Sequence, residues 1–339
     1  IRDPGELLSV LLADEGMPAA AGRLTGAMRF VGRKDDAERI VRTMRQARFD
    51  FRVSNPFEIP APTLSISRER SPYVLRLQSM WAGWREDVLA LFPPPPGRPS
   101  SAKAYLASVA ERYRADAYNS LSIEGYQVDD ALIERVASKG WNPERDEQDR
   151  RNRDALAARG YYQAFQAVKT SLAEILSGEN PGRVAGVGHH RWYGELFAPA
   201  VALGILEPHH LAGYRNGPVY IRNSMHTPLP RDALTDAMEA LIGLLVLEPE
   251  PAVRAVIGHH LFVFIHPYFD GNGRIGRFLM NVMLASGGYP WTVVRMKRRD
   301  TYMRALESAS SGGDIKPLAR FIAEEMREWE PGKPARRKR

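Results

Sequence analysis

Two apolar segments joined by a short polar run constrain the fold of this chain more than any other feature. Residues 252–265 and 278–285 consist mostly of Ala, Val, Ile, Leu, Phe and Met, which is typical of helices that are buried on most sides. The run between them carries one imidazole, one carboxylate, two glycines around an amide and two guanidinium groups: His266-Pro267-Tyr268-Phe269-Asp270-Gly271-Asn272-Gly273-Arg274-Ile275-Gly276-Arg277. The sequence therefore predicts two core helices that hold a chemically dense loop between them.

The glycines and arginines of this loop favour an anion-binding site. Gly271 and Gly273 can adopt positive φ without a Cβ clash, so consecutive N–H groups can point inward. The helix that follows adds a partial positive charge and free N–H donors at its N-terminus. Arg274 and Arg277 are three residues apart and share one helix face, where each guanidinium can bind two phosphate oxygens.

His266 and Asp270 extend this interpretation from binding to chemistry. A carboxylate beside phosphates is unfavourable unless it binds a divalent cation, and Asp270 bound to Mg²⁺ resolves that conflict. An imidazole has an unperturbed pKa of about 6.5, so His266 can accept a proton near neutral pH. A lone Gly-Asn-Gly is usually a simple turn, but a turn needs no His, Asp and two Arg at fixed offsets. The combination predicts phosphate transfer to a hydroxyl group.

The run resembles the signature of Fic-domain proteins, His-Pro-Phe-x-(Asp/Glu)-Gly-Asn-Gly-Arg-x-x-Arg, and departs from it at Tyr268. The resemblance implies a protein adenylyltransferase that moves AMP from ATP to a Ser, Thr or Tyr hydroxyl of a target protein. It implies His266 as the base, Asp270 as the Mg²⁺ ligand and Arg277 as the contact to the γ-phosphate. It also implies a cradle for the α- and β-phosphates made of Gly271, Asn272, Gly273 and Arg274. Doc-type kinases of the family carry Lys at position 270, so the resemblance argues against protein phosphorylation.

A second segment, Ser120-Leu121-Ser122-Ile123-Glu124-Gly125, matches the family's inhibitory pattern (Ser/Thr)-x-x-x-Glu-(Gly/Asn). The resemblance implies an ion pair between Glu124 and Arg277 that denies this arginine to the γ-phosphate. Before it, residues 102–118 are expected to form a helix with Ser100 or Ser101 as its N-cap. The alternative is that Gly125 merely ends this helix as a C-cap residue.

Residues 214–223 resemble the Fic flap, a β-hairpin over the active-site loop to which a target strand can be added. By this resemblance Ile221, Arg222, Asn223 and Ser224 lie along the nucleotide. Tyr302 sits where related proteins place an aromatic side chain near adenine, although a Tyr buried in the core fits its helix equally well.

The composition describes a globular protein and excludes several classes. The chain has 339 residues, 44% hydrophobic and 26% charged. It has no cysteine, so disulfides and cysteine-based metal sites are impossible. It lacks a long apolar run and a signal-peptide pattern, so we expect no membrane partner and a cytoplasmic location. It begins with Ile, so we expect a piece of a longer protein.

The periodicity predicts an all-α architecture with a small hairpin, plus a small N-terminal helical or mixed domain. The resemblance implies that this architecture is the Fic-fold helical bundle with a small β-hairpin flap. We expect a domain at 1–70, a helix and Pro-rich connector at 71–99, the catalytic domain with the inhibitory helix at its start at 100–328, and a disordered basic tail at 329–339. Predicted helices lie near 7–12, 19–31, 36–48, 72–92, 102–120, 128–139, 147–177, 189–203, 231–247, 252–265, 273–287, 300–310 and 315–330.

Several alternatives stay open at this point. The same site can remove AMP from a modified protein if Glu124 orients a water molecule. The chain can also be a nucleotide-sensing regulator that binds DNA or protein through its N-terminal helices or basic tail. Further candidate partners are the chain itself as a substrate and a second copy in a homodimer, packed through an exposed face around Trp81 and Trp84.

Overall fold

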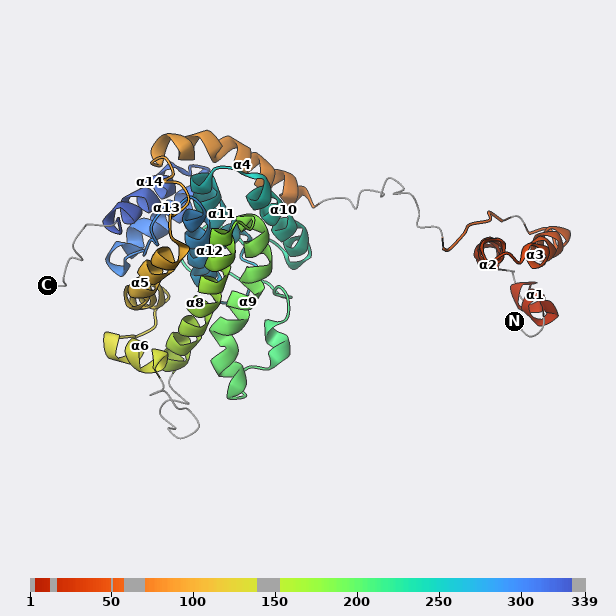
Figure 1. Cartoon of the computed structure of the whole chain (residues 1–339), viewed down its shortest axis with the longest axis horizontal. Helices are drawn as coiled ribbons and strands as arrows, with labels where there is room; N and C mark the ends of the chain where they lie inside the picture. Colours follow the sequence, from red (N-terminus) through yellow and green to blue (C-terminus); the bar gives the residue numbers. More distant parts are fainter. Residues whose placement is uncertain (1–3, 13–16, 50, 58–70, 139–152, 331–339) are drawn as a thin grey trace. The chain divides into compact units, whose positions relative to one another are not determined.

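The computed structural model describes residues 4–12, 17–49, 51–57, 71–138 and 153–330. The chain divides into two compact units, Ile1–Glu69 and Arg70–Arg339, which are drawn in Figure 1 and described separately here. Of the basic tail predicted at 329–339, residues 331–339 lie outside the described residues. So do the end of the helix predicted at 128–139 and the start of the one predicted at 147–177. The prediction of the tail began too early, because Trp329 packs against the core of the second unit and its indole N–H donates to the Val293 carbonyl at 3.2 Å.

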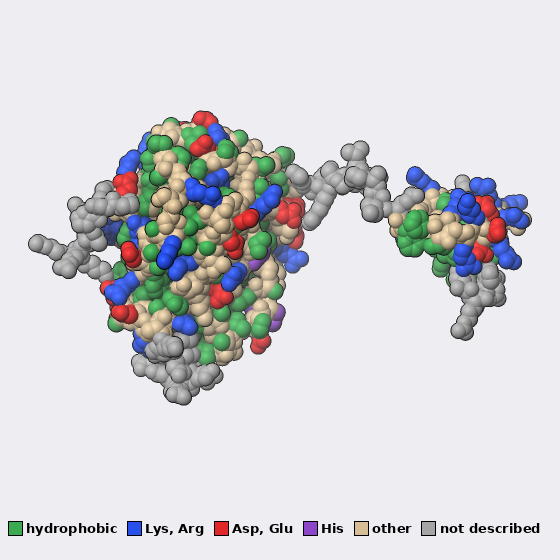
Figure 2. Space-filling model, in the orientation of Figure 1, with side chains coloured by type: hydrophobic (Ala, Val, Ile, Leu, Met, Phe, Trp, Pro, Cys, Tyr) green, Lys and Arg blue, Asp and Glu red, His purple; other side chains and the backbone are tan. Residues whose placement is uncertain are grey.

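The described residues of the first unit form three short helices, α1 (Pro4–Leu12), α2 (Pro18–Phe30) and α3 (Lys34–Gln46), as the periodicity predicted. Their apolar faces form a small core around Ile40 and Met44. Arg and Lys side chains gather on the surface of this unit (Figure 2). Gly22 and Gly26 let the segment after α3 approach closely, because a Cβ at either position would lie within 2.2 Å of a backbone oxygen of that segment.

The described residues of the second unit form an all-helical bundle. Its helices are α4 (Pro72–Leu91), α5 (Ala102–Ile123), α6 (Asp130–Ala137), α8 (Arg153–Ser177), α9 (Pro181–Ala202), η1 (Pro208–Leu211), η2 (Arg231–Ala233), α10 (Leu234–Leu247), α11 (Pro251–Ile265), α12 (Asn272–Ser286), η3 (Met296–Arg298), α13 (Arg299–Gly312) and α14 (Lys316–Glu328). Side-chain N-caps begin several of them: the Ser101 hydroxyl accepts from the N–H of Ala104, and Asn180 does the same for Arg183.

The two apolar helices predicted from the sequence form the centre of the bundle (Figure 1). Every residue of α11 except Val263 is buried. α11 packs against α12, α4 and α10, while α12 also packs against α8 and α9. The polar loop between α11 and α12 is therefore fixed on both sides by helices that cannot shift without disturbing the core.

α4 belongs to this core, which corrects one expectation from the sequence. Trp81 and Trp84 are 5% and 7% exposed, so they do not form the exposed face suggested for a homodimer. Their indole N–H groups donate to Glu248 Oε2 at 3.1 Å and to the Gly313 carbonyl at 2.9 Å. The periodicity correctly predicted an apolar stripe, but the stripe packs against α10, α11 and α14 of the same chain.

The expected β-hairpin is not formed, because none of the residues from 212 to 230 is in a strand. Pro218, Pro228 and Pro230 have no N–H to give to a ladder. The guanidinium of Arg215 instead binds the loop together, donating to the carbonyl oxygens of Gly217 and Leu229. The segment is an ordered loop that keeps the position, though not the secondary structure, expected of a flap.

Candidate active site

The loop between α11 and α12 begins and ends with left-handed backbone. His266, the C-cap residue of α11, has φ of 55°, and Gly271, the N-cap of α12, has φ of 84°. Asn272 ties the loop across: its side chain accepts from the Tyr268 N–H at 2.9 Å and donates to the Tyr268 carbonyl at 2.7 Å. The Asn272 side chain is thus committed to shaping the loop, and only its backbone N–H is left for an anion.

The ring of Tyr268 anchors this loop to α9. It stacks on Tyr193 with ring centroids 3.7 Å apart and planes inclined by 6°. Its hydroxyl lies 3.1 Å from Nδ1 of His190, and burial lowers the pKa of that imidazole. In the sequence Tyr268 is the one departure from the signature, and nothing there signals its hydrogen bond to His190.

A cavity of about 400 Å³, called here the His266 pocket, collects most of the predicted site residues. Its lining includes the predicted base, the second arginine, one loop glycine, the inhibitory carboxylate, four loop residues and the aromatic of α13: His266, Arg277, Gly273, Glu124, Ile221, Arg222, Asn223, Ser224 and Tyr302. Residues more than 100 positions apart in the sequence thus line one space beside the N-terminus of α12.

The His266 imidazole is held as a neutral base. Burial lowers its pKa to about 4, although the nearby Val263 carbonyl favours the charged form. Nδ1 lies 3.2 Å from that carbonyl oxygen, so the proton of the neutral ring sits on Nδ1 and Nε2 has its lone pair free. Arg215 fixes the backbone at this point by donating from Nε to the His266 carbonyl at 2.8 Å.

The carboxylate of Glu124 forms an ion pair with the guanidinium of Arg277 within the same pocket. Nη2 of Arg277 donates to Glu124 Oε1 at 2.7 Å, and Nε donates to the Ser120 hydroxyl at 2.9 Å. Burial alone would lower the pKa of Arg277, but the Glu124 carboxylate more than offsets this and raises it. A Cβ at Gly273 would lie 2.3 Å from Glu124 Oε1, so only glycine admits the carboxylate this close to α12.

The segment that ends α5 forms both the expected glycine C-cap and the expected contact with Arg277. Gly125 has φ of 88°, its N–H donates to the Ser122 carbonyl at 3.0 Å, and the Tyr126 N–H donates to the Leu121 carbonyl at 3.1 Å. These two bonds form a Schellman motif that ends the helix at Glu124. The glycine cap therefore ends the helix and also directs the Glu124 side chain toward Arg277.

Asp270 and Arg274 line a different cavity, of about 340 Å³, together with Tyr126 and Phe197. Arg274 Nη2 donates to Asp270 Oδ2 at 2.9 Å, while Asp270 Oδ1 accepts from the Gly271 N–H. The guanidinium carbon of Arg274 lies 5.2 Å and 5.4 Å from the ring centroids of Tyr126 and Phe197. The turn that contains Glu124 and Tyr126 thus lines both cavities, Glu124 the first and Tyr126 the second. The site residues predicted from the sequence are therefore divided between two cavities.

Comparison with known proteins agrees with this geometry. Residues 200–284, which include the whole polar loop, match the family model for the Fic/DOC family. The match identifies a Fic domain in this part of the chain. It is 38% identical over 125 residues to the protein adenylyltransferase Fic of Nematostella vectensis, covering 36% of this chain and 29% of that protein. It is 36% identical over 126 residues to the protein of the same name from Culex quinquefasciatus, covering 36% of this chain and 25% of that protein.

The match extends over less than a third of the length of these relatives. A solved structure of Fic-1 (residues 134–508) from C. elegans aligns with a TM-score of 0.53 at 17% identity, covering 96% of this chain and 90% of that chain. This similarity supports the Fic fold of the bundle. Within the residues that the structure describes, every helix is too short or too polar to span a bilayer.

Several residues of this Fic domain were not singled out from the sequence. Glu307 of α13 accepts from the Ser224 hydroxyl at 2.6 Å and from the Met225 N–H at 2.9 Å, which holds the loop against α13 at the wall of the His266 pocket. Arg215, 5% exposed, fixes the same loop from its other end. Both act on residues far away in sequence, and no local spacing signals such contacts.

Tyr302 is buried in the core, as one of the two interpretations expected, and also lines the His266 pocket of the Fic domain. It is 1% exposed, and its hydroxyl lies 2.8 Å from Nε2 of His259. The ring of Tyr302 is therefore a rigid wall of the pocket. Its hydroxyl group already has a hydrogen-bond partner within the core.

Proposed function

We propose that this Fic domain transfers AMP from ATP to a hydroxyl group of a protein and that Glu124 restrains it by occupying Arg277. The observation that carries this proposal is the shared cavity of His266 and Arg277 beside the N-terminus of α12. A neutral base and a fixed cation next to free backbone N–H groups are what transfer of a nucleotidyl group to an alcohol requires.

The chemical step follows from the free lone pair on His266 Nε2. The hydroxyl oxygen of the target attacks the α-phosphorus, its proton passes to Nε2, and the bond between the α-phosphorus and the bridging oxygen breaks to release pyrophosphate. A pKa of about 4 makes His266 a weak base that is nevertheless fully unprotonated at pH 7. The catalytic contribution of the imidazole is therefore mainly to accept the proton as the new bond forms.

The first turn of α12 supplies the binding energy for the phosphates. The N–H groups of the first helical residues have no intrahelical acceptor, and the helix dipole favours negative charge at this end. Arg274 is buried, and among the described residues its Nε has no hydrogen-bond partner. A buried guanidinium with an unused donor fits a phosphate oxygen, in keeping with the cradle expected from the sequence.

Mg²⁺ fits Asp270 as a cation that arrives with the nucleotide. Among the described residues no group of three or more His, Asp or Glu side chains is arranged to hold a metal ion. The Asp270 side chain is 60% exposed and adjoins the phosphate-binding turn, and Mg²⁺ commonly uses one carboxylate together with phosphate oxygens and water. When bound there, it would neutralise charge on the phosphate chain.

Glu124 restrains the reaction in this proposal by electrostatics and by volume. Its carboxylate already satisfies Nη2 of Arg277 and lies over Gly273, where the terminal phosphate of ATP would bind. The like charge repels that phosphate, so bound nucleotide adopts a pose unsuited to attack.

The proposal is tested with labelled ATP and Mg²⁺ in cell lysate. The Glu124→Gly variant is expected to transfer label to protein, either to a lysate protein or to itself, far more than the unaltered chain does. A Glu124→Gly, His266→Ala double variant is the matched control and is expected to transfer none. An inactive Glu124→Gly variant that binds ATP would overturn the proposal.

Removal of AMP by the same site is a second candidate, favoured by one observation. The Glu124 side chain is 28% exposed and lines the His266 pocket, so it can also hold a water molecule there. Release of AMP from an AMP-modified protein by the unaltered chain, abolished by Glu124→Gly, would identify this activity. Glu124→Gly thus moves the two activities in opposite directions.

A further inference from the structure

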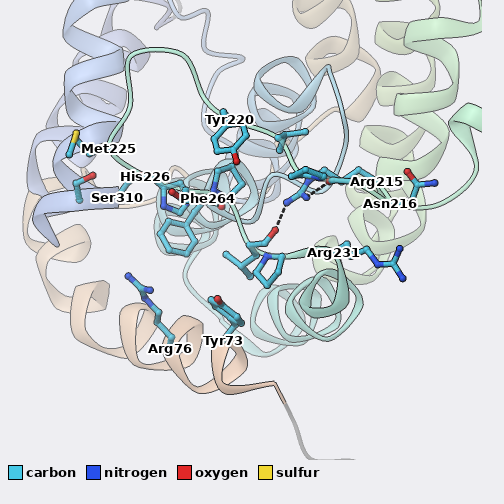
Figure 3. A pocket seen from close by; sticks show the side chains of 18 residues that line it. Tyr73, Arg76, Arg215, Asn216, Tyr220, Met225, His226, Arg231, Phe264 and Ser310 are labelled. Atoms are coloured by element: carbon cyan, nitrogen blue, oxygen red, sulfur yellow. Dashed lines mark hydrogen bonds between the residues drawn. The ribbon is translucent and has the colours of Figure 1, made fainter.

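A groove of about 800 Å³ lies beside the His266 pocket and has no role in the chemistry described above. Figure 3 shows it between the first turns of α4, which contribute Tyr73 and Arg76, and the loop from Arg215 to Arg231. His226 and Ser310 line both the groove and the His266 pocket. A chain lying in the groove would therefore run up to the wall of the pocket where the base is held.

The groove is positively charged. Arg76 is exposed and makes no ion pair within the described residues, with its guanidinium carbon 5.4 Å from the centroid of the Phe264 ring. Arg231 is 63% exposed, and among the residues that the structure describes it forms an ion pair only with its neighbour Asp232, which does not line the groove. None of the described residues that line it is Asp or Glu. An electropositive groove of this kind attracts and orients acidic segments.

A third guanidinium adds fixed charge near the junction with the pocket. Arg215 donates to the carbonyl oxygens of His266, Gly217 and Leu229, so its hydrogen bonds are made to neutral groups. Its side chain is 5% exposed, and burial lowers its pKa. Its positive charge is thus held in place by the loop and adds to the positive potential of the groove.

The rest of the lining is apolar and aromatic. Tyr220 and Met225 are 84% and 86% exposed, which is unusual for large side chains of an ordered loop. His226 stacks on Phe264 with ring centroids 4.0 Å apart, and both rings line the groove. Exposed aromatic and Met side chains together with Arg are typical of surfaces that bind protein.

We propose that this groove binds the segment of the protein substrate next to the modified hydroxyl and selects segments that carry acidic side chains. The inference rests on the proposed function, because it assigns the class of protein segment that the same site accepts. The occupant is a peptide because the groove combines a few arginines with apolar side chains and leads to a base that accepts the proton of a side-chain hydroxyl. To bind a nucleic acid, the groove would instead need a row of Lys or Arg side chains along the phosphate backbone of that nucleic acid.

Peptide binding tests this selectivity without requiring catalysis. Fluorescein-labelled 13-residue peptides carry one central Ser flanked by Glu, by Gln or by Lys. Their affinities for the Glu124→Gly chain are measured by fluorescence anisotropy. The Glu-flanked peptide is expected to bind at least about tenfold more tightly than the Gln-flanked one, and the Lys-flanked one least tightly.

Charge reversal locates the site. The Arg76→Glu, Arg231→Glu double variant is expected to weaken binding of the Glu-flanked peptide by about tenfold or more and to leave the Gln-flanked peptide within about twofold. Arg320→Glu, at an exposed arginine of α14 that does not line the groove, is the matched control and should leave both affinities unchanged. Melting temperatures of the variants check that the fold is intact.

Three results overturn the inference: equal binding of the three peptides or no binding of any, an equal loss with Arg320→Glu, or tighter binding of a single-stranded oligothymidine than of the Glu-flanked peptide. AMP transfer to lysate protein by the same Glu124→Gly preparation is measured in parallel. If lysate protein is labelled but the Glu-flanked peptide does not bind more tightly than the others, only the assignment of the groove is contradicted. If no lysate protein is labelled, the proposed function is contradicted.

Discussion

The carboxylate of Glu124 lies 2.7 Å from Nη2 of Arg277, although 153 positions separate the two residues along the chain. Arg277 is 4% exposed, so it has no room to bind a phosphate while the carboxylate is in place. The turn that presents Glu124 is fixed by the Schellman motif at Gly125, and the contact is therefore part of the folded structure rather than a chance surface pair.

Replacing Glu124 by Gln should tighten ATP binding by about tenfold. The amide keeps the shape of the side chain but removes the charge that repels phosphate, and a charge-assisted hydrogen bond contributes about 1.5–3 kcal/mol. Isothermal titration with Mg²⁺ and a non-hydrolysable ATP analogue measures the change. Glu134→Gln, at an exposed carboxylate of α6 paired with Arg114, is the matched control. Equal affinities of the Glu124→Gln variant and the unaltered chain would contradict the restraint.

The sequence predicted those parts of the site that are encoded locally. Gly271 predicted the left-handed turn before α12, whereas Gly273 lies inside α12 and does not take the positive φ expected of it. The Glu124–Arg277 contact was expected from the resemblance of the Ser120–Gly125 segment to the family pattern. The helices were predicted because apolar periodicity and caps such as Ser101 are properties of short stretches. The left-handed turn, the helices and their caps depend on residues at most a few positions apart.

The remainder depends on contacts between distant segments. The flap was predicted as a hairpin from its turn and β-prone residues, yet Arg215 and the prolines hold it as a loop. The split between the two cavities arises because the turn after α5 packs against α12, which no local pattern records. The Trp81 and Trp84 stripe was predicted correctly but its partner was not, because periodicity shows that a face is buried and not what buries it.

Tyr268→Phe tests a contact that the signature alone would not suggest. The change removes the hydroxyl that lies 3.1 Å from His190 Nδ1 but keeps the ring stacked on Tyr193. We expect a loss of about 1 kcal/mol in the free energy of unfolding, with AMP transfer by the Glu124→Gly background unchanged. Chemical denaturation measures the loss. In a double-mutant cycle with His190→Ala, additive effects of the two changes would show that the hydroxyl and the imidazole do not interact.

The free energy of unfolding should fall as the pH is lowered from about 6.5 toward 4. Burial lowers the pKa of His189, His259 and His266 to about 4 and that of His260 to about 3. A lowered pKa means that the unfolded chain takes up the proton first, so acid favours unfolding until the folded imidazole titrates as well. Each such histidine contributes a slope of up to about 1.4 kcal/mol per pH unit in that window.

His260→Leu isolates one contributor to this acid sensitivity. His260 is 1% exposed, and neither ring nitrogen has a hydrogen-bond partner within the described residues. Its ring packs edge-on against Trp84, so a leucine of similar volume replaces apolar contacts and removes two unsatisfied polar atoms. The variant should be at least as stable at pH 7.5 and show a shallower decline in melting temperature down to pH 5. An unchanged slope would show that His260 is not held neutral.

Glu307→Ala should raise the KM for ATP several-fold in the Glu124→Gly background while changing kcat little. Glu307 holds the loop at the wall of the His266 pocket through the Ser224 hydroxyl and the Met225 N–H, and these hydrogen bonds lower its pKa although partial burial opposes the shift. Without the carboxylate the loop must be ordered by the nucleotide itself, which costs binding energy and leaves His266 in place. Ser311→Ala is the control, since it removes a contact to Glu307 at 2.7 Å but keeps the carboxylate on the loop. An equal rise in KM for the two variants would mean that the loop contacts do not position ATP.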